Sequence, residues 1–345
     1  YALYAAINFV IFLTKNMRAR RDPLYAKILD DLRWGRLTDQ QLDILNSRVH
    51  KPEDLLSART NDTHNLYKPV VVCTNKLRCA INSNIIFRIA LSRTIPVFEC
   101  LAIPCNRSRL IVEHLWNIDD NFTDRIPMKL LFYVGMPVMV THKHPDLLGA
   151  DIIANGTIAT IIGTYPPLDE MPEIIYEAGN VVIHKLLRQP SLLLIKLLGV
   201  TTTLVEGFPE GVIGLPALKG RVSLKQIPNL ARSSITVTQF ALVPAFACTT
   251  EKLQGQTCHD GVVVTPLDNR QSVPSQTLYV ALSRSVSLDG LSLTQSISRS
   301  YLGKFVPNQE TVNEMQRLMN LVSVPPFASA EERISFDQWK STQHT

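Results

Sequence analysis

The first fifty residues carry the pattern of two amphipathic helices. Asp22 stands before Pro23, an order typical of a helix N-cap followed by proline at the first helical position. The apolar positions that follow recur on one helical face, at Leu24, Ile28, Leu29 and Leu32. Gly35 predicts the end of this helix, and Thr38 with Gln41 predicts a capping box at the start of the next one. A polar stretch over residues 51–68 then predicts a loop.

The apolar run "PVVVC" after residue 68 lacks polar alternation, which indicates a parallel strand buried on both faces. Thr74 is a good N-cap, and we expect a following helix that turns Leu77, Ile81 and Ile85 inward. A strand followed by a capped helix is half of a βαβ unit. The α/β pattern returns after residue 240 as a strand, a tight turn, a strand at 262–264, a helix over "SQTLYVALSRS" and a strand at "GLSLT".

Between residues 134 and 238 the pattern changes to short apolar runs separated by prolines and glycines. "YVGMPVMVTHK" and "TIATIIGT" predict strands, with Asn155-Gly156 as the turn before the second. This predicts a small antiparallel β-barrel or sheet inserted into an α/β domain. We expect α/β segments at 1–133 and 239–325, the insertion at 134–238 and a polar tail at 326–345. The opening "YALYAAINFVIFLT" predicts a buried helix and strand.

The overall composition narrows the class of protein only slightly. Apolar residues make up 46% and charged residues 19%, which is ordinary for a folded protein. The net charge of +5 favours a polyanionic partner mildly, and a solvated surface explains it about as well. The six cysteines include no Cys-x-x-Cys pair, which favours a reducing compartment over a disulfide or zinc framework. Lys196 interrupts the longest apolar stretch, so we expect no membrane span.

Two arginines stand next to apolar segments. Arg284 comes near the end of a predicted apolar helix, where a guanidinium needs a carboxylate, a phosphate or water. Arg18 follows an apolar run and has Arg20 and Arg21 beside it. Taken alone, a structural salt bridge is the commoner explanation of Arg284, and a solvated basic face is the commoner explanation of Arg18.

The turn between the two strands after residue 240 concentrates hydrogen-bonding groups. Gln254, Gly255, Gln256 and Thr257 supply backbone N–H groups, two amides and a hydroxyl, and Gly255 permits a positive φ. A tight β-turn explains this pattern as well as a ligand site does. The "HKH" at 142–144 shows no third metal ligand, so we expect a hairpin loop there.

The sequence lacks the motifs that hold nucleotide phosphates and their metal. Its only Gly-Lys pair, Gly303-Lys304, has no glycine five residues before it, so there is no P-loop. Asp169 and Glu170 follow two prolines rather than a buried strand, which makes them a poor magnesium site. If the chain meets a nucleotide, another segment supplies most of that site.

Taken in order, five blocks resemble the C-terminal half of Pif-type DNA helicases, superfamily-one enzymes that move 5′ to 3′. The blocks are "FLTKNMRARRDPLYAKILDDLRWGRLT", "VVVCTNKLRCAIN", "MKLLFYVGMPVMV" with "IANGTIATIIG", "QFALVPAFACTTEKLQGQT" and "LYVALSRSVSLDGLSL". The family includes helicase-like proteins of fungal genomes and of rolling-circle transposons. The resemblance covers roughly residues 9 to 320, and the common order of the blocks is more specific than any one of them.

The resemblance implies a RecA-like parallel sheet flanked by helices, with a small β-barrel inserted in it. In such helicases ATP lies between two RecA-like domains: the first brings the P-loop and the Mg²⁺ ligands, and the second brings arginine fingers. By position in the family's pattern, the fingers are Arg18 and Arg284. The resemblance places Gln254, Gly255 and Gln256 between ATP and DNA. It places the following residues on the track of single-stranded DNA: Thr74, Asn75, Thr249, Thr250 and Lys252.

The resemblance also implies that the chain is a fragment, or a truncated product, of an ATP-dependent DNA helicase. The first domain, which binds most of the ATP and Mg²⁺, is a missing partner, and we expect no hydrolysis without it. An intracellular protein of the nucleus or mitochondrion, acting in DNA repair or recombination, fits the family. Glu251 stands where the family has histidine, and its carboxylate weakens affinity for a phosphate track. A non-enzymatic nucleic-acid-binding module and a decayed transposon remnant stay open as alternatives.

Overall fold

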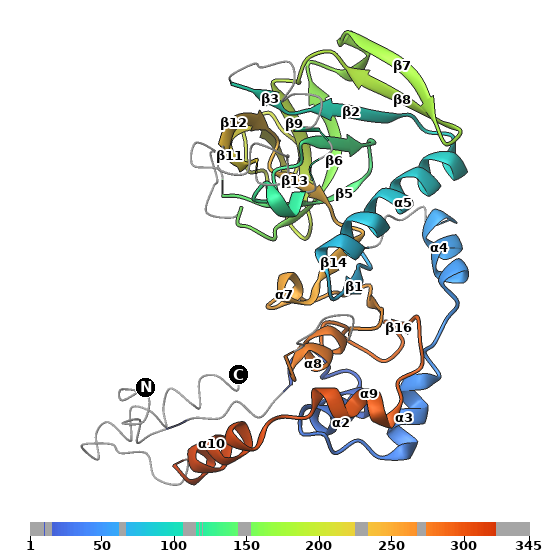
Figure 1. Cartoon of the computed structure of the whole chain (residues 1–345), viewed down its shortest axis with the longest axis vertical. Coiled ribbons are helices and arrows are strands. Elements are labelled where there is room, and N and C mark those ends of the chain that lie inside the picture. Colours follow the sequence, from blue (N-terminus) through green and yellow to red (C-terminus); the bar gives the residue numbers. More distant parts are fainter. Residues whose placement is uncertain are drawn as a thin grey trace, which may run out of the picture.

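The computed structural model describes residues 10, 16–61, 67–105, 115–116, 118, 120–143, 153–224, 234–267 and 274–321. The part of the chain that it describes divides into a β-rich end and an end built from helices around a parallel sheet (Figure 1). Apart from residue 10, the predicted helix and strand at 1–14 lie outside the described residues, as does the predicted tail at 326–345.

A parallel sheet of four strands organises the helical end. Its strands are β14 (Ala247–Thr249), β1 (Val70–Val72), β15 (Val262–Val264) and β16 (Leu291–Leu293), in that order. All three pairings are parallel, with Val71 beside Cys248 on one side and Val264 on the other. The predicted parallel sheet is therefore confirmed, with strands from residues before and after the β-rich end.

Helices cover both faces of this sheet. One face packs against α2 (Pro23–Arg33), α3 (Asp39–Asn46) and α8 (Thr277–Leu282) in a single apolar core. The other face meets α5 (Asn75–Arg93) and α4 (Pro52–Asn61). None of the described helices has the length and hydropathy that a membrane span requires.

The predicted helix starts are confirmed by their cap hydrogen bonds. Asp22 accepts from the backbone N–H of Tyr25 at 2.9 Å, and Thr38 forms the full capping box with Gln41. The Thr74 hydroxyl accepts from the N–H of Leu77 at 3.3 Å. Each cap satisfies backbone groups that a helix terminus otherwise leaves without a partner.

Two predictions about apolar faces were only partly right. Leu24 is 50% exposed, although the rest of its predicted face in α2 is buried. In α5, Ile85 is buried as expected, whereas Leu77 and Ile81 are half-buried and border an apolar cavity of about 460 Å³ beside α4.

The loop prediction for residues 51–68 was wrong where α4 lies. Pro52 opens this helix and Glu53 and Asp54 occupy its first turn, where carboxylates favour the positive end of the helix dipole. Leu55 and Leu56 turn toward α5 across the apolar cavity. The polar composition of this stretch did not indicate α4, which packs against α5 through Leu55 and Leu56.

The β-rich end consists of three sheets of small size. One has five antiparallel strands in the order β10 (Val212–Leu215), β9 (Leu192–Leu197), β6 (Ile158–Tyr165), β5 (Pro137–Val140) and β13 (Leu242–Pro244). A second has β11 (Leu218–Ser223), β12 (Ser234–Gln239) and β3 (Ile103–Pro104). The third has β4 (Lys129–Phe132), β2 (Val97–Leu101), β8 (Val181–Leu186) and β7 (Glu173–Ala178).

Strand pairing in the β-rich end crosses both predicted segment limits. Three strands of the β-rich end precede residue 134: β2 pairs with β8 and β4, and β3 pairs with β12. One strand follows residue 238: β13 pairs with β5. Antiparallel sheets are present as predicted, and no pairing among the described residues closes them into a barrel. The limits at 133 and 239 stay a prediction about domains.

The remaining described elements are short, apart from one C-terminal helix. They are η1 (Asp120–Phe122), η3 (Leu168–Glu170), α7 (Thr250–Leu253), α9 (Arg299–Leu302), η4 (Gly303–Phe305) and α10 (Gln309–Asn320).

Asn82 fastens α5 to the edge of the parallel sheet. Its amide NH₂ donates to the carbonyls of Pro244 at 3.0 Å and Ala247 at 3.2 Å, and its amide oxygen accepts from the N–H of Ala247 at 2.7 Å. The side chain is buried, and it bonds the backbone groups of Ala247 that a neighbouring strand would otherwise bond at this edge of β14. It therefore joins the helical end to the chain segment that returns from the β-rich end.

We expect Asn82→Ala to lower the free energy of unfolding by roughly 2–3 kcal/mol, because it leaves buried backbone groups of Ala247 without partners. Asn84→Ala is the matched control, since Asn84 is an exposed residue of the same helix. Urea unfolding followed by circular dichroism measures both. Equal midpoints for the two variants would contradict this role of Asn82.

Candidate functional site

The turn after β14 brings its polar groups to the surface. β14 leads into α7, and the N–H of Gln256 then donates to the carbonyl of Leu253 at 3.0 Å. Gly255 has a φ of +88°, which glycine adopts without the steric cost that other residues meet. Gln254 and Gly255 are exposed, and apart from the two chain neighbours of Gly255 no described residue has an atom within 4 Å of the place where a Cβ on Gly255 would stand. The predicted tight turn is present, and its outer side is open.

Arg284 lies beneath this turn. Its Nη1 donates to the carbonyl of Gln256 at 3.2 Å and to that of Leu253 at 3.4 Å. Nε donates to the carbonyl of Val280 at 2.9 Å, and Nη2 to the hydroxyl of Ser283 at 2.8 Å. The residue is only 7% exposed, so its guanidinium does not line an open cleft. Its charge is surrounded by carbonyl and hydroxyl oxygens.

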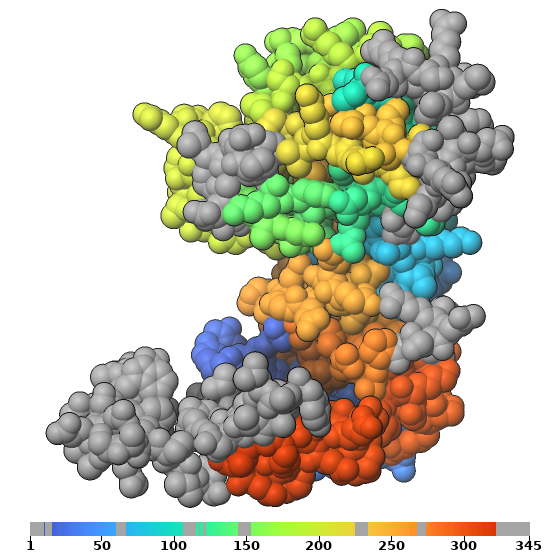
Figure 2. All heavy atoms as spheres, turned by 60° about the vertical axis from the view of Figure 1, so that its left-hand side comes forward, coloured from blue at the N-terminus to red at the C-terminus, as the bar shows by residue number. Residues whose placement is uncertain are grey.

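Arg18 reaches the same place from the N-terminal side of α2. Its Nε donates to the hydroxyl of Thr257 at 3.0 Å, and its Nη1 donates to the carbonyl of Ser283 at 3.0 Å. Ser283 thus contacts both guanidinium groups, one through its carbonyl and one through its hydroxyl. Figure 2 shows the blue segment that contains Arg18 against the orange segments that follow residue 240.

The two arginines form a cationic pair. Among the described residues, no Asp or Glu lies within 4.0 Å of either guanidinium, so this part of the chain supplies neither of them with an ion-pair partner. Burial, and then the charge of Arg18, lower the pKa of Arg284. Burial raises the pKa of the Cys258 thiol to about 11, while Arg284 and Arg18 act in the opposite direction. The pair is therefore a fixed positive charge next to an exposed turn.

The same turn touches the β-rich end on its other side. Lys252 Nζ donates to the side-chain oxygen of Asn155 at 2.7 Å, and Gln256 Nε2 donates to the carbonyl of Gly156 at 3.0 Å. Asn155 and Gly156 form the predicted turn before β6, with a φ of +102° at Gly156. Residues 252–256 therefore lie between the arginine pair and the β-rich end.

A narrow groove runs beside Lys252. Eleven residues of α5, the β-rich end and the β13–α7 segment line it: Asn75, Arg78, Arg125, Met139, Thr141, Asn155, Val243, Pro244, Ala247, Cys248 and Lys252. Three of them carry the positive charge that a nucleic-acid backbone requires, although the charge of Arg78 is already paired with Asp120. Asn75 and Lys252, which the resemblance places on the DNA track, thus line the same groove.

The predicted threonines lie at the same edge of the parallel sheet but are less accessible. β1 and β14 are parallel neighbours, so Thr74 and Thr250 both follow the carboxyl ends of strands. Thr74 is half-buried and caps α5, while Thr249 and Thr250 are each 4% exposed. The hydroxyl of Thr250 is buried and has no hydrogen-bond partner in the described part of the chain.

Sequence reasoning missed Arg78 and Arg125 in the groove. Arg78 is three residues after Asn75 in α5, and residues at that spacing share a helical face, so its position could have been inferred. It is buried and forms an ion pair with Asp120. Arg125 has a φ of +61° in a loop whose sequence carries no signal for its position.

The part of the chain that the structure describes contains no metal site. No group of three His, Cys, Asp or Glu side chains able to hold a metal occurs among the described residues. His142 instead contacts Asp124 at 3.2 Å and the Thr141 hydroxyl at 3.0 Å, and His144 lies outside the described residues.

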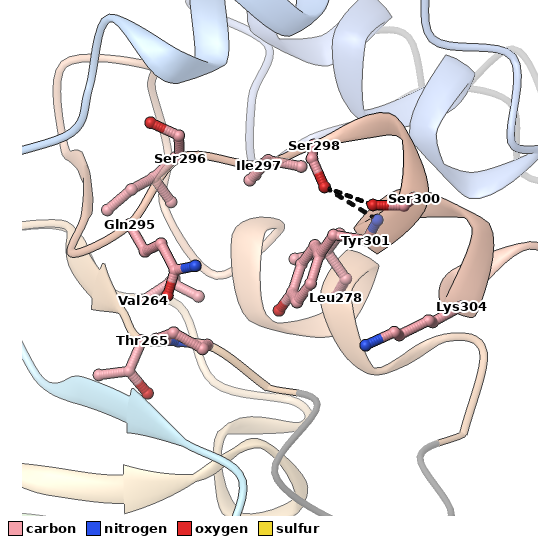
Figure 3. Close-up of a pocket in the computed structure, with 12 residues that line it drawn as sticks. Val264, Thr265, Leu278, Gln295, Ser296, Ile297, Ser298, Ser300, Tyr301 and Lys304 are labelled. Atoms are coloured by element: carbon pink, nitrogen blue, oxygen red, sulfur yellow. Dashed lines mark hydrogen bonds between the residues drawn. The ribbon is translucent and has the colours of Figure 1, made fainter.

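A polar cavity of about 200 Å³ lies at the carboxyl ends of β15 and β16 (Figure 3). Thr265, Gln295 and Tyr301 border it, and the Ser298 hydroxyl accepts from the N–H of Tyr301 at 3.1 Å. None of the predicted site residues lines this cavity. It is separate from the arginine pair and the groove.

Comparison with solved structures finds the same fold in Pif1 helicases. Pif1 from Candida albicans matches 88% of this chain and 60% of its own, with a TM-score of 0.54 at 19% identity. The match with Bacteroides Pif1 bound to single-stranded DNA covers 90% of this chain and 56% of that one, with a TM-score of 0.55 at 14% identity. The match with Bacteroides Pif1 in complex with ADP-AlF3 and single-stranded DNA covers 90% of this chain and 56% of that one. Its TM-score is 0.52 at 16% sequence identity.

The chain has a Pif1-like fold. It spans between 56% and 60% of the length of these solved Pif1 structures. No protein-family model and no curated protein sequence matches it. The Pif1-like fold confirms the predicted mixed α/β class with a parallel sheet flanked by helices.

Proposed function

We propose that this chain is the second motor domain of an ATP-dependent DNA helicase. One observation carries the proposal: Arg18 and Arg284 converge beside one exposed turn and have no carboxylate partner among the described residues. Two guanidiniums held together repel each other, and an anion placed between them relieves that repulsion. In this proposal the anion is the phosphoryl group of ATP, held by a P-loop domain that is not within these 345 residues.

The residues present fit one side of a nucleotide site. The arginine pair supplies positive charge, and the open outer side of Gly255 leaves room for a ligand to approach the turn. Gln254, Gly255 and Gln256 would then lie between nucleotide and DNA. Magnesium ligands and the phosphate cradle would come from the first domain, so the chain alone would not hydrolyse ATP. When bound, ATP and Mg²⁺ supply the phosphoryl group and the charge that bridges its oxygens.

The groove beside Lys252 supports single-stranded DNA as the second ligand. Lys252, Arg78 and Arg125 line it, and Asn75 adds a neutral hydrogen-bonding group. The groove joins the arginine pair through the turn at 252–256. Two of the similar Pif1 structures contain bound single-stranded DNA, and one of these also contains ADP-AlF3. The buried Thr249 and Thr250 would act by shaping this edge more than by direct contact.

A non-enzymatic nucleic-acid-binding module is the second candidate. The cationic groove favours it, because the groove requires no ATP. A decayed transposon remnant is a third possibility that the intact packing of the arginine pair does not favour. The coding sequence upstream distinguishes them: a P-loop and an acidic pair there favour the motor domain.

We expect the chain to bind single-stranded DNA weakly, in a salt-sensitive way and with little sequence preference. Lys252→Ala should weaken binding and reduce the slope of log affinity against log salt by about 0.7, the value for one phosphate contact on a single strand. Fluorescence anisotropy with labelled oligonucleotides at several salt concentrations measures both quantities.

Lys219→Ala is the matched control, because Lys219 is an exposed lysine on β11 that does not line the groove. We expect it to change neither affinity nor slope. If the two lysine variants behave alike, DNA does not follow the groove. That result would not bear on the proposed role of the arginine pair, which these two variants do not test.

A further inference from the structure

The hairpin of β7 and β8 lies at the outer rim of the β-rich end (Figure 1). β7 is the last strand of its sheet, and Gly179 and Asn180 form the two-residue turn, both with positive φ. In such a hairpin the residues next to the turn form a hydrogen-bonded pair, and pairing then alternates along the strand. Ala178 and every second residue before it therefore bond to β8.

The other β7 residues turn their backbone groups away from the sheet. The N–H of Leu187 donates to the carbonyl of Pro172 at 2.9 Å, which follows the same alternation. Glu173, Ile175 and Glu177 consequently present N–H and C=O groups at an open edge. None of these outward groups has a partner in the described part of the chain.

Other features show that this edge is not protected in the usual ways. Natural edge strands are commonly blocked by charged side chains, lysine above all, by proline or by a bulge. β7 contains no lysine, proline or bulge, and its charged residues are Glu173 and Glu177, both negative. Ile174 and Ile175 are 52% and 58% exposed. At the parallel sheet, by contrast, the edge strand β14 is closed by Asn82, which bonds both backbone groups of Ala247.

The charge around β7 selects among possible partners. Every charged residue from 165 to 180 is acidic, in a chain whose net charge is +5: Asp169, Glu170, Glu173 and Glu177. The Glu173 carboxylate also contacts Nδ1 of His184 on β8 at 2.9 Å. Two copies of β7 paired antiparallel about Ile175 would place Glu173 opposite Glu177, and like charges directly opposite destabilise a strand pair. The edge therefore disfavours a second copy and favours a basic strand.

We infer that β7 is a docking edge for an extended segment of a partner protein with basic residues four positions apart and apolar residues between them. Antiparallel addition places the two basic residues opposite Glu177 and Glu173, and the central apolar residues beside Ile174 to Tyr176. Backbone hydrogen bonds at Glu173, Ile175 and Glu177 hold the segment, and the glutamates select its charge. This surface is separate from the arginine pair and does not depend on the proposed helicase function.

The test uses the full chain and a fluorescent peptide containing Lys-Val-Val-Val-Lys between Ser-Gly flanks. We expect saturable binding by anisotropy, and at least about tenfold weaker binding of the same peptide with both lysines changed to glutamate. Glu177→Lys should reduce this preference by at least about fivefold. Lys219→Ala, a charge change on β11 away from the hairpin, should leave it unchanged.

Ile175→Pro separates edge pairing from loose charge attraction. The N–H of Ile175 faces outward, so proline there removes a docking group without breaking a bond to β8, and edge strands tolerate it. We expect this variant to keep the wild-type circular dichroism spectrum and to lose peptide binding. Absent binding, equal binding of both peptides, or undiminished binding by Ile175→Pro overturns the inference. So does dimerisation of the wild-type chain that Ile175→Pro abolishes, because a second copy would then occupy the edge.

Discussion

Arg18→Ala should reduce ATP turnover by about 10³–10⁵-fold in a protein where this chain follows a P-loop domain, as loss of an arginine finger does. Arg18 is half-buried and makes two hydrogen bonds, to Thr257 and to Ser283. Its loss should therefore lower the free energy of unfolding by about 1 kcal/mol or less. The expected pattern is a large kinetic effect with a small structural one.

Arg21→Ala is the control for this result, because Arg21 is exposed and three residues away in the same basic cluster. Steady-state hydrolysis with saturating single-stranded DNA gives the turnover, and thermal unfolding of the chain alone gives the stability. We expect Arg21→Ala to match the wild type in both measurements. Turnover by Arg18→Ala within a few-fold of wild type would remove Arg18 from the catalytic residues.

Arg284→Ala should lose both activity and stability. The residue is 7% exposed, and its guanidinium donates to the carbonyls of Leu253, Gln256 and Val280. Truncation leaves the Gln256 carbonyl without this donor and removes one of two donors from the carbonyls of Leu253 and Val280. We expect a loss of roughly 2–4 kcal/mol in the free energy of unfolding. Turnover per folded molecule should also fall by about 10³-fold or more.

Arg284→Lys separates the two roles. Lysine keeps a positive charge but cannot reproduce the planar fork that contacts several carbonyls at once. Turnover is measured at a temperature where denaturant titration shows every variant fully folded. If folded Arg284→Ala turns over normally, Arg284 only holds the turn in place, and Arg18 alone would carry the proposed catalytic charge.

The fold was predictable where local chemistry and apolar period agreed. The caps at Asp22, Thr38 and Thr74 involve neighbours in sequence, and the unbroken valines of β1 require burial on both faces. The loop predicted at 51–68 failed because composition does not show which leucines a neighbouring helix covers. The assignment of β2 to the β-rich end depends on pairing with β8, which is remote in sequence.

The sequence predicts a set of site residues but not their surroundings. The resemblance assigns Arg18 and Arg284 to ATP and Gln254 to Gln256 to the turn between ATP and DNA; the structure places both guanidiniums beside this turn, and the roles stay a prediction. The sequence could not show that Arg284 is buried, because the carbonyls that accept from its guanidinium come from three separate backbone positions. Nor could it place Arg125, whose position depends on a loop rather than on a repeating element.

The central claim is that Arg18 and Arg284 stabilise charge on a transferring phosphoryl group. ADP with aluminium fluoride resembles the transition state of that transfer, and groups that act there bind it more tightly than ADP alone. The direct measurement is the affinity of the two-domain protein for ADP with and without aluminium fluoride. We predict that aluminium fluoride tightens binding at least about 100-fold in the wild type and hardly at all in Arg18→Ala and Arg284→Lys, while affinity for ADP alone stays the same in all three. Equal tightening in the wild type and both variants would contradict the account.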